Sequence, residues 1–260
     1  MRHRVLIPAL IVVLAFAWSA SSGAETMQIE NLRVTFSANF TPNVLPRLRP
    51  APVDIAIHGK VATTDGSHPP PLRWIEVKLN RNGRLDARGL PVCAAPTLQS
   101  TSTVTALDRC GAARVGSGRF RAEVTLGRPV PVTGRIFAFN SRRHGRPALL
   151  LHLFAGAPVR FTLVVPLTIG HQRNGEFGTV LRARIPKLAG DLGSVTEIDL
   201  TIGRRYSFAG KRHSYVSAAC STPAGIDSAL FPFARGTFRF EAHREFSETL
   251  LRGCRVAGGS

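Results

Sequence analysis

Histidines and carboxylates are the side chains of this sequence best suited to acid–base chemistry, but they form no recognisable catalytic motif. The H-E-x-x-H, G-x-S-x-G and P-loop patterns are absent, and no two histidines stand at metal-ligand spacing. His152 lies between Leu151 and Leu153 in an apolar run, which predicts a core histidine that bonds to the backbone or to a carboxylate. The alternative is a pocket that His152 shares with His171 or Asn140.

Two further patterns could hold a substrate or an ion. Glu197 and Asp199 share a face of one expected strand, which allows the paired-carboxylate chemistry of glycoside hydrolysis, although we favour a solvated outer face that balances the arginines. The stretch from Asn80 to Asp86 is superficially similar to a calcium loop, but Lys78 would occupy its first ligand position. We therefore expect a hairpin turn there, and no metal ion, cofactor or catalytic residue.

Basic side chains gather in two short stretches that we expect to be turns. The first contains Arg142, Arg143 and Arg146, and the second contains Arg204, Arg205, Lys211 and Arg212. Tyr206 and Phe208 are interleaved with the second stretch, and guanidinium groups beside aromatic rings can hold phosphates or sulfates. The formal net charge of +18 attracts polyanions in a salt-dependent way. We predict an anion-binding site at these turns; the alternative is that hairpin tips of a very basic protein are simply basic.

The first 24 residues have the features of a secretory signal peptide. Arg2 and Arg4 make a positive start, an apolar run covers residues 5–18, and small residues at 22–24 predict cleavage after Ala24. The run is shorter than the roughly 20 residues of a membrane-spanning helix, so an anchor is the lesser alternative. We expect a secreted or extracytoplasmic protein with no transmembrane segment after cleavage, and export argues against a nucleic-acid partner.

The four cysteines predict two disulfides, because an even number of cysteines in an exported protein favours pairing. No two of them have the C-x-x-C spacing of a redox or zinc site. Three connectivities are possible. Joining Cys93 to Cys110 and Cys220 to Cys254 closes the shortest loops, and we favour that pairing for this reason alone.

The spacing of apolar residues predicts strands along the whole chain after the signal peptide. Apolar and polar residues alternate in short stretches such as 74–79 and 195–202, and turn residues separate them. The longest apolar runs lie between Val130 and Gly170 and suit strands that are buried on both faces. The sequence therefore predicts an all-β fold, an antiparallel β-sandwich of about a dozen strands in a single domain over residues 25–260.

At most one short helix is expected, within residues 97–111. Thr103 would cap its start, residues 104–109 would form it, and Gly111 would end it.

Four stretches of the sequence carry a family resemblance. They are NRNGRLDARGLPVC at residues 80–93, FAFN at 137–140, FGTVL at 177–181 and SYVSAAC at 214–220. Together with the strand that contains His152, they resemble an uncharacterised family of exported bacterial proteins. The resemblance covers most of the chain after the signal peptide and implies export and an all-β structure. No activity is attached to this family, so the resemblance implies no catalytic residue.

Three functions are compatible with these features. The one we favour is a non-catalytic exported β-sandwich protein that binds a partner in the envelope or outside the cell, with an anionic polymer as the candidate. A secreted hydrolase with a histidine and carboxylates on rim loops is the second, and a carrier of a small apolar ligand in the β core is the third. A filled core with one basic face would favour the first, a polar cleft the second, and a closed apolar cavity of roughly 300 Å³ or more the third.

Overall fold

A single large sheet forms most of the computed structural model, in which residues 24–258 are described. The signal peptide expected over residues 1–24 lies outside the described residues, apart from Ala24. The sheet has thirteen strands, and every neighbouring pair is antiparallel except the last. In spatial order the strands are β1 (Glu25–Ile29), β2 (Leu32–Thr41), β5 (Asp54–Thr63), β13 (Gly193–Ile202), β8 (Arg114–Leu126), β9 (Arg128–Arg143), β10 (Arg146–Ala155), β11 (Phe161–His171), β12 (Phe177–Arg184), β6 (Leu72–Asn80), β17 (Ser228–Phe240), β18 (Glu245–Val256) and β3 (Val44–Leu45).

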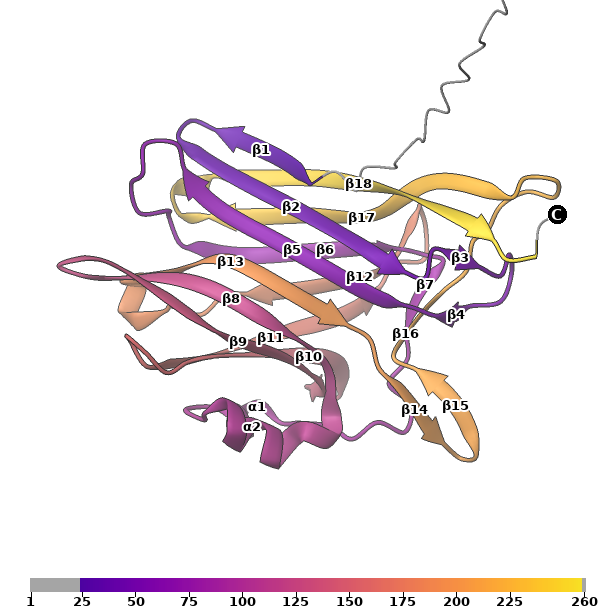
Figure 1. Ribbon diagram of the computed structural model, residues 1–260, viewed down its shortest axis with the longest axis horizontal. Coiled ribbons are helices and arrows are strands. Elements are labelled where there is room, and N and C mark those ends of the chain that lie inside the picture. The colour runs from indigo at the N-terminus through magenta and orange to yellow at the C-terminus, as the bar shows by residue number, and fades with distance from the viewer. Residues whose placement is uncertain (1–23, 259–260) are drawn as a thin grey trace, which may run out of the picture.

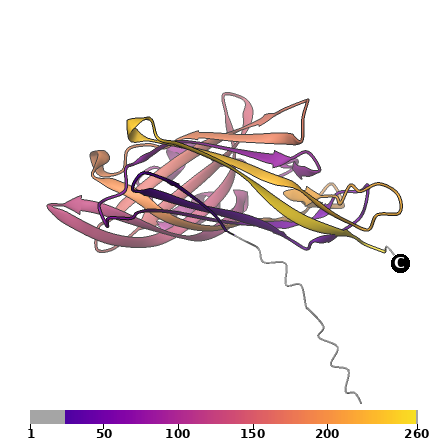
Figure 2. The ribbon, with the colours of Figure 1, turned by 90° about the horizontal axis from the view of Figure 1, so that it is seen from above.

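The sheet curls into a half-barrel, so strands from its two ends come together (Figures 1 and 2). Arg252 of β18 donates a hydrogen bond to the backbone oxygen of Ala38 on β2, at 2.8 Å. Inside the curl, the rings of Phe36 on β2 and Phe238 on β17 pack edge to face with centroids 5.2 Å apart. The all-β prediction is confirmed. A sandwich of two packed sheets is not, because backbone pairing continues from strand to strand without dividing the large sheet in two.

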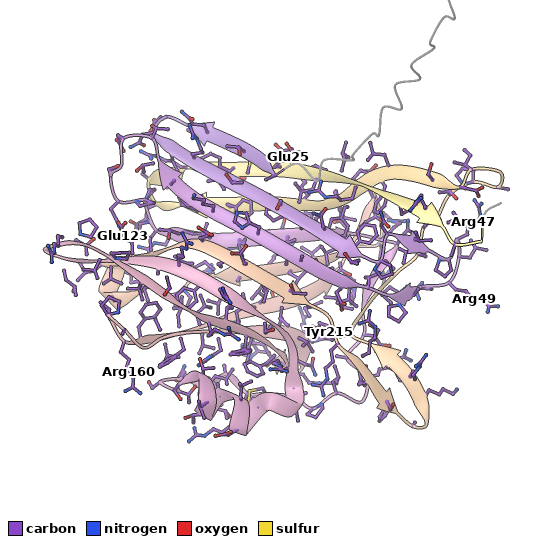
Figure 3. The ribbon with its side chains drawn as sticks, in the orientation of Figure 1. Glu25, Arg47, Arg49, Glu123, Arg160 and Tyr215 are labelled. Atoms are coloured by element: carbon purple, nitrogen blue, oxygen red, sulfur yellow. A yellow bond between two sulfur atoms is a disulfide. The ribbon has the colours of Figure 1, made fainter. Side chains whose placement is uncertain are left out.

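The two edges of the sheet differ in the length of the connections they carry. Because adjacent strands alternate in direction, the long connections 42–53, 81–113 and 203–227 all leave from the same edge, which we call the loop edge. The opposite edge, which we call the turn edge, carries the shorter connections, among them the β8–β9 turn and segment 64–71. Figure 3 shows Arg47 and Arg49 at the loop edge and Glu123 and Arg160 at the turn edge.

Two small sheets lie at the loop edge. One consists of β4 (Ala51–Pro52), β16 (Val216–Ala218) and β7 (Gly83–Leu85), and the other is the hairpin of β14 (Arg205–Phe208) and β15 (Lys211–Ser214). Two 3-10 turns, η2 (Ala189–Asp191) and η3 (Glu241–His243), lie at the turn edge.

A helical segment covers the outer face of β9 and β10. It consists of α1 (Ala95–Leu98), α2 (Thr103–Cys110) and the 3-10 turn η1 (Gly111–Ala113). A second apolar core forms beneath it, in which Leu98 and Ala106 pack on Phe139 and Leu150 of the sheet. This cover explains why the apolar runs between residues 130 and 170 are continuous: β9 and β10 bury side chains on both faces, as the sequence predicts.

The helix expected within residues 97–111 differs from the observed one at its start. Ser102, not Thr103, is the N-cap, because its hydroxyl oxygen accepts a hydrogen bond from the backbone N–H of Thr105 at 3.2 Å. Gly111 ends α2 as predicted.

The two disulfides join the cysteines whose pairing closes the shortest loops, which is the pairing that the sequence analysis favours. Cys93 joins Cys110 with Cα atoms 5.5 Å apart, and Cys220 joins Cys254 with Cα atoms 5.8 Å apart. The first closes the loop that contains the helical cover. The second ties connection 203–227 to the end of β18, so both stabilise the loop edge. Disulfides of this kind are typical of extracytoplasmic proteins. Within residues 24–258, no helix is both long enough and apolar enough to cross a membrane.

Candidate functional site

An apolar cavity of about 210 Å³ lies inside the half-barrel. Its walls come from β2, β5, β13, β10, β11, β12 and β6, whose alternating side chains face the interior. Ile57, Ile75, Leu79 and Ile198 line it and are only partly buried, although they belong to the apolar face of their strands. The curl therefore holds opposite walls too far apart for these side chains to fill the space between them.

One end of the cavity lies where β5 and β13 separate. Their pairing runs from Ile202 opposite Ile55 to Glu197 opposite Lys60 and stops there. Beyond this point β5 pairs only with β2, and β13 pairs only with β8, so the two strands diverge toward the turn edge (Figure 1). Residues on both sides of this split line the cavity. We call the gap between 61–63 of β5 and 193–196 of β13 the split.

Segment 64–71 connects β5 to β6 and is fastened to the far side of the split. The hydroxyl of Ser194 on β13 donates a hydrogen bond to the backbone oxygen of Pro69, at 3.0 Å. His68 contacts the carboxylate of Glu123 on β8 through its Nδ1 atom. These two contacts hold the segment across the turn-edge end of the cavity.

The loop-edge end of the cavity is closed by Leu85 of β7 and by Tyr215, which stands between β15 and β16. Figure 3 places Tyr215 beside the base of the β14–β15 hairpin. Its side chain is 1% exposed, and its hydroxyl has no hydrogen-bond partner among the described residues. Burial raises the pKa of this phenol, so the hydroxyl remains protonated.

The charged residues along the cavity belong to its open end. Lys60 and Glu197 are the last pair of the β5–β13 ladder, and Arg73 of β6 forms an ion pair with Glu241. The remaining wall is almost wholly aliphatic or aromatic, and no pair of carboxylates faces the interior among residues 24–258. The interior is therefore suited to binding an apolar molecule rather than to acid–base catalysis.

His152 is a core histidine, as the sequence predicts. It is fully buried on the outer face of β10, beneath the helical cover, and its Nε2–H donates a hydrogen bond to the backbone oxygen of Thr101 at 3.1 Å. Its Nδ1 has no partner among the described residues, and burial lowers its pKa. The alternative pocket does not form: Asn140 donates instead to the backbone oxygen of Pro91, and His171 is exposed.

Glu197 and Asp199 lie on the outer face of β13, where the structure adds His58 from β5 to them. His58 Nδ1 is 2.7 Å from Asp199 Oδ1, and potential metal-ligand atoms of the three residues lie within 4.8 Å of one another. Arg121 Nη1 lies 3.7 Å from Glu197 Oε2, so its guanidinium group would compete with a metal ion for this carboxylate. Ser37 stands opposite His58 in the register, but no hydrogen bond joins them in the described structure. The hydrolase alternative requires a histidine and carboxylates on rim loops. These three residues lie instead on an exposed face of the sheet.

The two predicted basic turns emerge from the same edge of the sheet. β9 and β13 run in the same direction because β8 lies between them, so both turns lie at the loop edge. Arg204 donates to the backbone oxygens of Ala112 and Arg114, and Arg205 pairs with Asp54 at 3.3 Å. The five other members are exposed and form no ion pair within residues 24–258: Arg142, Arg143, Arg146, Lys211 and Arg212.

Sequence reasoning missed Tyr215 as a wall of the cavity and the split between β5 and β13. The alternation along residues 195–202 assigns the inward face of β13, but it carries no information about whether that face meets another wall. Strand β5 itself continues to Thr63, past Lys60, where its pairing with β13 stops.

Comparison with known proteins adds no functional assignment. No family model matches the chain, and no curated protein or solved structure is significantly similar to it.

Proposed function

We propose that this protein binds a small apolar molecule in the half-barrel cavity and carries it outside the cytoplasm. The observation on which the proposal rests is the unfilled apolar interior of about 210 Å³. Side chains along this interior lack contact atoms on one side, and van der Waals contacts are lost where no atom fills the gap. A ligand in the cavity would restore the missing contacts.

The size of the cavity limits the ligand. It is partly open and smaller than the closed cavity of roughly 300 Å³ that the sequence analysis set for a carrier, so the proposal requires a ligand smaller than a drug-sized molecule. The extracytoplasmic part of the proposal is supported by the two disulfides and by the signal peptide that the sequence predicts. A carrier is useful there because apolar molecules dissolve poorly in water.

The decisive experiment measures binding of the branched alkane 2-methylheptane to the purified protein and to two variants of β13. Wild type is expected to bind one molecule saturably. Ile198→Trp places a large ring in the cavity and should weaken binding by at least about tenfold, or about 1.4 kcal/mol. Thr201→Trp adds the same ring to the exposed face of the same strand and is the matched control.

Titration calorimetry and the rise in thermal midpoint with ligand concentration provide two independent readouts. Absence of saturable binding to wild type would refute the carrier function. Equal losses in the two tryptophan variants would show that the alkane does not bind in the half-barrel.

Binding of an anionic polymer at the loop edge is a second candidate function, favoured by the shared location of the two basic turns. Exposed charges at one edge add their fields over distances comparable to the Debye length, about 8 Å at physiological salt. The anion site would be separate from the split, which lies at the turn edge.

We predict that replacing Arg142, Arg143 and Arg146 with serine lowers the salt concentration at which the protein elutes from a sulfated anionic column. Loss of three contacts should also reduce the slope of log affinity against log salt by roughly 2–3. The matched control replaces three exposed arginines of the turn edge, Arg128, Arg160 and Arg184. If both triple variants elute equally early, the charge acts diffusely and the loop edge is not a site.

A further inference from the structure

We infer that the protein docks on a lipid bilayer that contains anionic lipid, through a patch at the loop edge that we call the apolar tip. The tip consists of five exposed aliphatic residues: Val44, Leu48, Ile226, Leu230 and Leu251. None of them lines the half-barrel cavity, so the inference goes beyond the proposed carrier function and does not depend on it.

The strand register gathers three of these side chains on one face of the sheet. Leu230 of β17 stands opposite Gly253 of β18, which makes it a diagonal neighbour of Leu251, about 7–8 Å away. Val44 of β3 stands opposite residue 255, two positions beyond Gly253 and on the same face of β18. Gly253 places no side chain between them. Val44, Leu230 and Leu251 therefore form one patch, and contiguous patches mark interaction sites more often than single exposed residues do.

The other two residues belong to connections that Arg47 ties together. Its guanidinium group donates to the backbone oxygens of Thr222 and Ile226, each at 3.0 Å, and pairs with Asp227 at 3.0 Å. Because Leu48 directly follows Arg47, Leu48 and Ile226 belong to the same protrusion. Figure 1 shows the connection before β17 and the end of β18 at this end of the molecule.

The tip has a fixed conformation. The disulfide between Cys220 and Cys254 joins the connection to β18, and the N–H of Cys220 donates to the backbone oxygen of Pro46 at 3.0 Å. Leu48 and Leu230 are nevertheless 81% and 69% exposed, more than any other large apolar side chain of residues 24–258. A bilayer can therefore bury these side chains without first ordering a flexible segment.

The charge of the loop edge selects the occupant. Its three long connections contain ten basic residues and three acidic ones: Arg47, Arg49, Arg81, Arg84, Arg88, Arg109, Arg204, Arg205, Lys211 and Arg212, against Asp86, Asp108 and Asp227. Arg49 and Arg255 are exposed beside the tip and form no ion pair within the described chain. A second copy would bring the same positive charge to the contact. Anionic head groups attract these cations, while the acyl chains beneath them accept the aliphatic side chains.

The test measures co-sedimentation of the protein with vesicles made of equal parts phosphatidylcholine and phosphatidylglycerol. The double variant Leu48→Ser/Leu230→Ser should bind at least about tenfold more weakly than wild type, because two leucines lose their burial in the bilayer. The matched control is Leu126→Ser/Leu192→Ser, which changes two exposed leucines of the turn edge and should keep the wild-type affinity. Added salt should weaken binding of wild type.

A fluorescence readout separates insertion from adhesion by charge. Tryptophan in Leu48→Trp should shift its emission to shorter wavelength on these vesicles and become protected from an aqueous quencher. The control Leu126→Trp should show neither change. Trp74 is present in both variants and contributes the same background.

Failure of wild type to bind the vesicles would overturn the inference. Full binding by the Leu48→Ser/Leu230→Ser variant, or unshifted emission of bound Leu48→Trp, would also overturn it, because charge alone would then hold the protein on the surface. A wild-type dimer that this leucine variant converts to a monomer would assign the tip to a second copy instead. Binding of 2-methylheptane is measured without vesicles, so the carrier function is judged separately. Elution of the leucine variant from the sulfated column should match wild type, which separates the bilayer from an anionic polymer.

Discussion

Replacing Cys220 and Cys254 with alanine is expected to lower the free energy of unfolding by about 4 kcal/mol. The disulfide closes a loop of 34 residues, and in the chain-entropy account a loop of this length restricts the unfolded chain by about that amount. Both sulfur-bearing side chains are buried, at 0% and 3% exposure, so their removal also reduces packing at the loop edge. Urea denaturation of the oxidised proteins measures the change.

The other disulfide is the matched control for this prediction. Cys93 and Cys110 are separated by only 17 residues, so their replacement should cost about 3 kcal/mol. The helical cover also remains fastened to β9, because the N–H of Cys93 donates to the backbone oxygen of Asn140 and the hydroxyl of Ser141 donates to the backbone oxygen of Cys93. A larger loss from the Cys93–Cys110 variant would contradict the ranking by loop length.

Protonation of His152 is expected to make the protein less stable in mild acid. The buried imidazole is neutral and its pKa is lowered by burial, whereas in the unfolded chain it binds a proton below its ordinary pKa of 6.5. As the pH falls through 6.5, the unfolded state therefore binds more protons than the folded state does. Stability should decrease by up to about 1.4 kcal/mol per pH unit from there down to the folded-state pKa.

The variant His152→Gln tests this prediction, because glutamine can donate a hydrogen bond and does not titrate. Urea unfolding of both proteins between about pH 7.5 and about pH 5 gives the difference in pH dependence, and contributions from other groups cancel in it. The exposed His171→Gln variant is the control and should keep the wild-type dependence. If His152→Gln also keeps the full dependence, the acid sensitivity belongs to other groups.

The arrangement of the half-barrel separates two tasks along its length. The two disulfides and the two small sheets stabilise the loop edge, where Tyr215 closes the cavity. The basic turns give the same edge its positive charge. The split between β5 and β13 lies at the turn edge, where hydrogen bonds to Ser194 and Asn31 hold segment 64–71 in place. In the proposed carrier, the ligand would enter at the turn edge, away from the cross-linked end.

Local patterns in the sequence identified the all-β class and many of the strands of this fold. Alternation along residues 74–79 and 195–202 places Ile75 and Ile198 on inward faces, because successive side chains of a strand point to opposite sides. Among three possible connectivities, loop length favoured the disulfide pairing that the structure shows, and the apolar neighbours of His152 indicated its burial. These properties depend on residues that are close in the sequence.

The site was decided by tertiary structure. The split exists because β5 pairs with β13 only up to Lys60, and the two strands are separated by more than a hundred residues in the chain. The same pairing places His58 beside Asp199. Curvature of the sheet leaves the cavity unfilled and brings Tyr215 to its closed end. Register and curvature depend on contacts between distant segments, so alternation within one strand predicts which side chains face inward but not what they meet there.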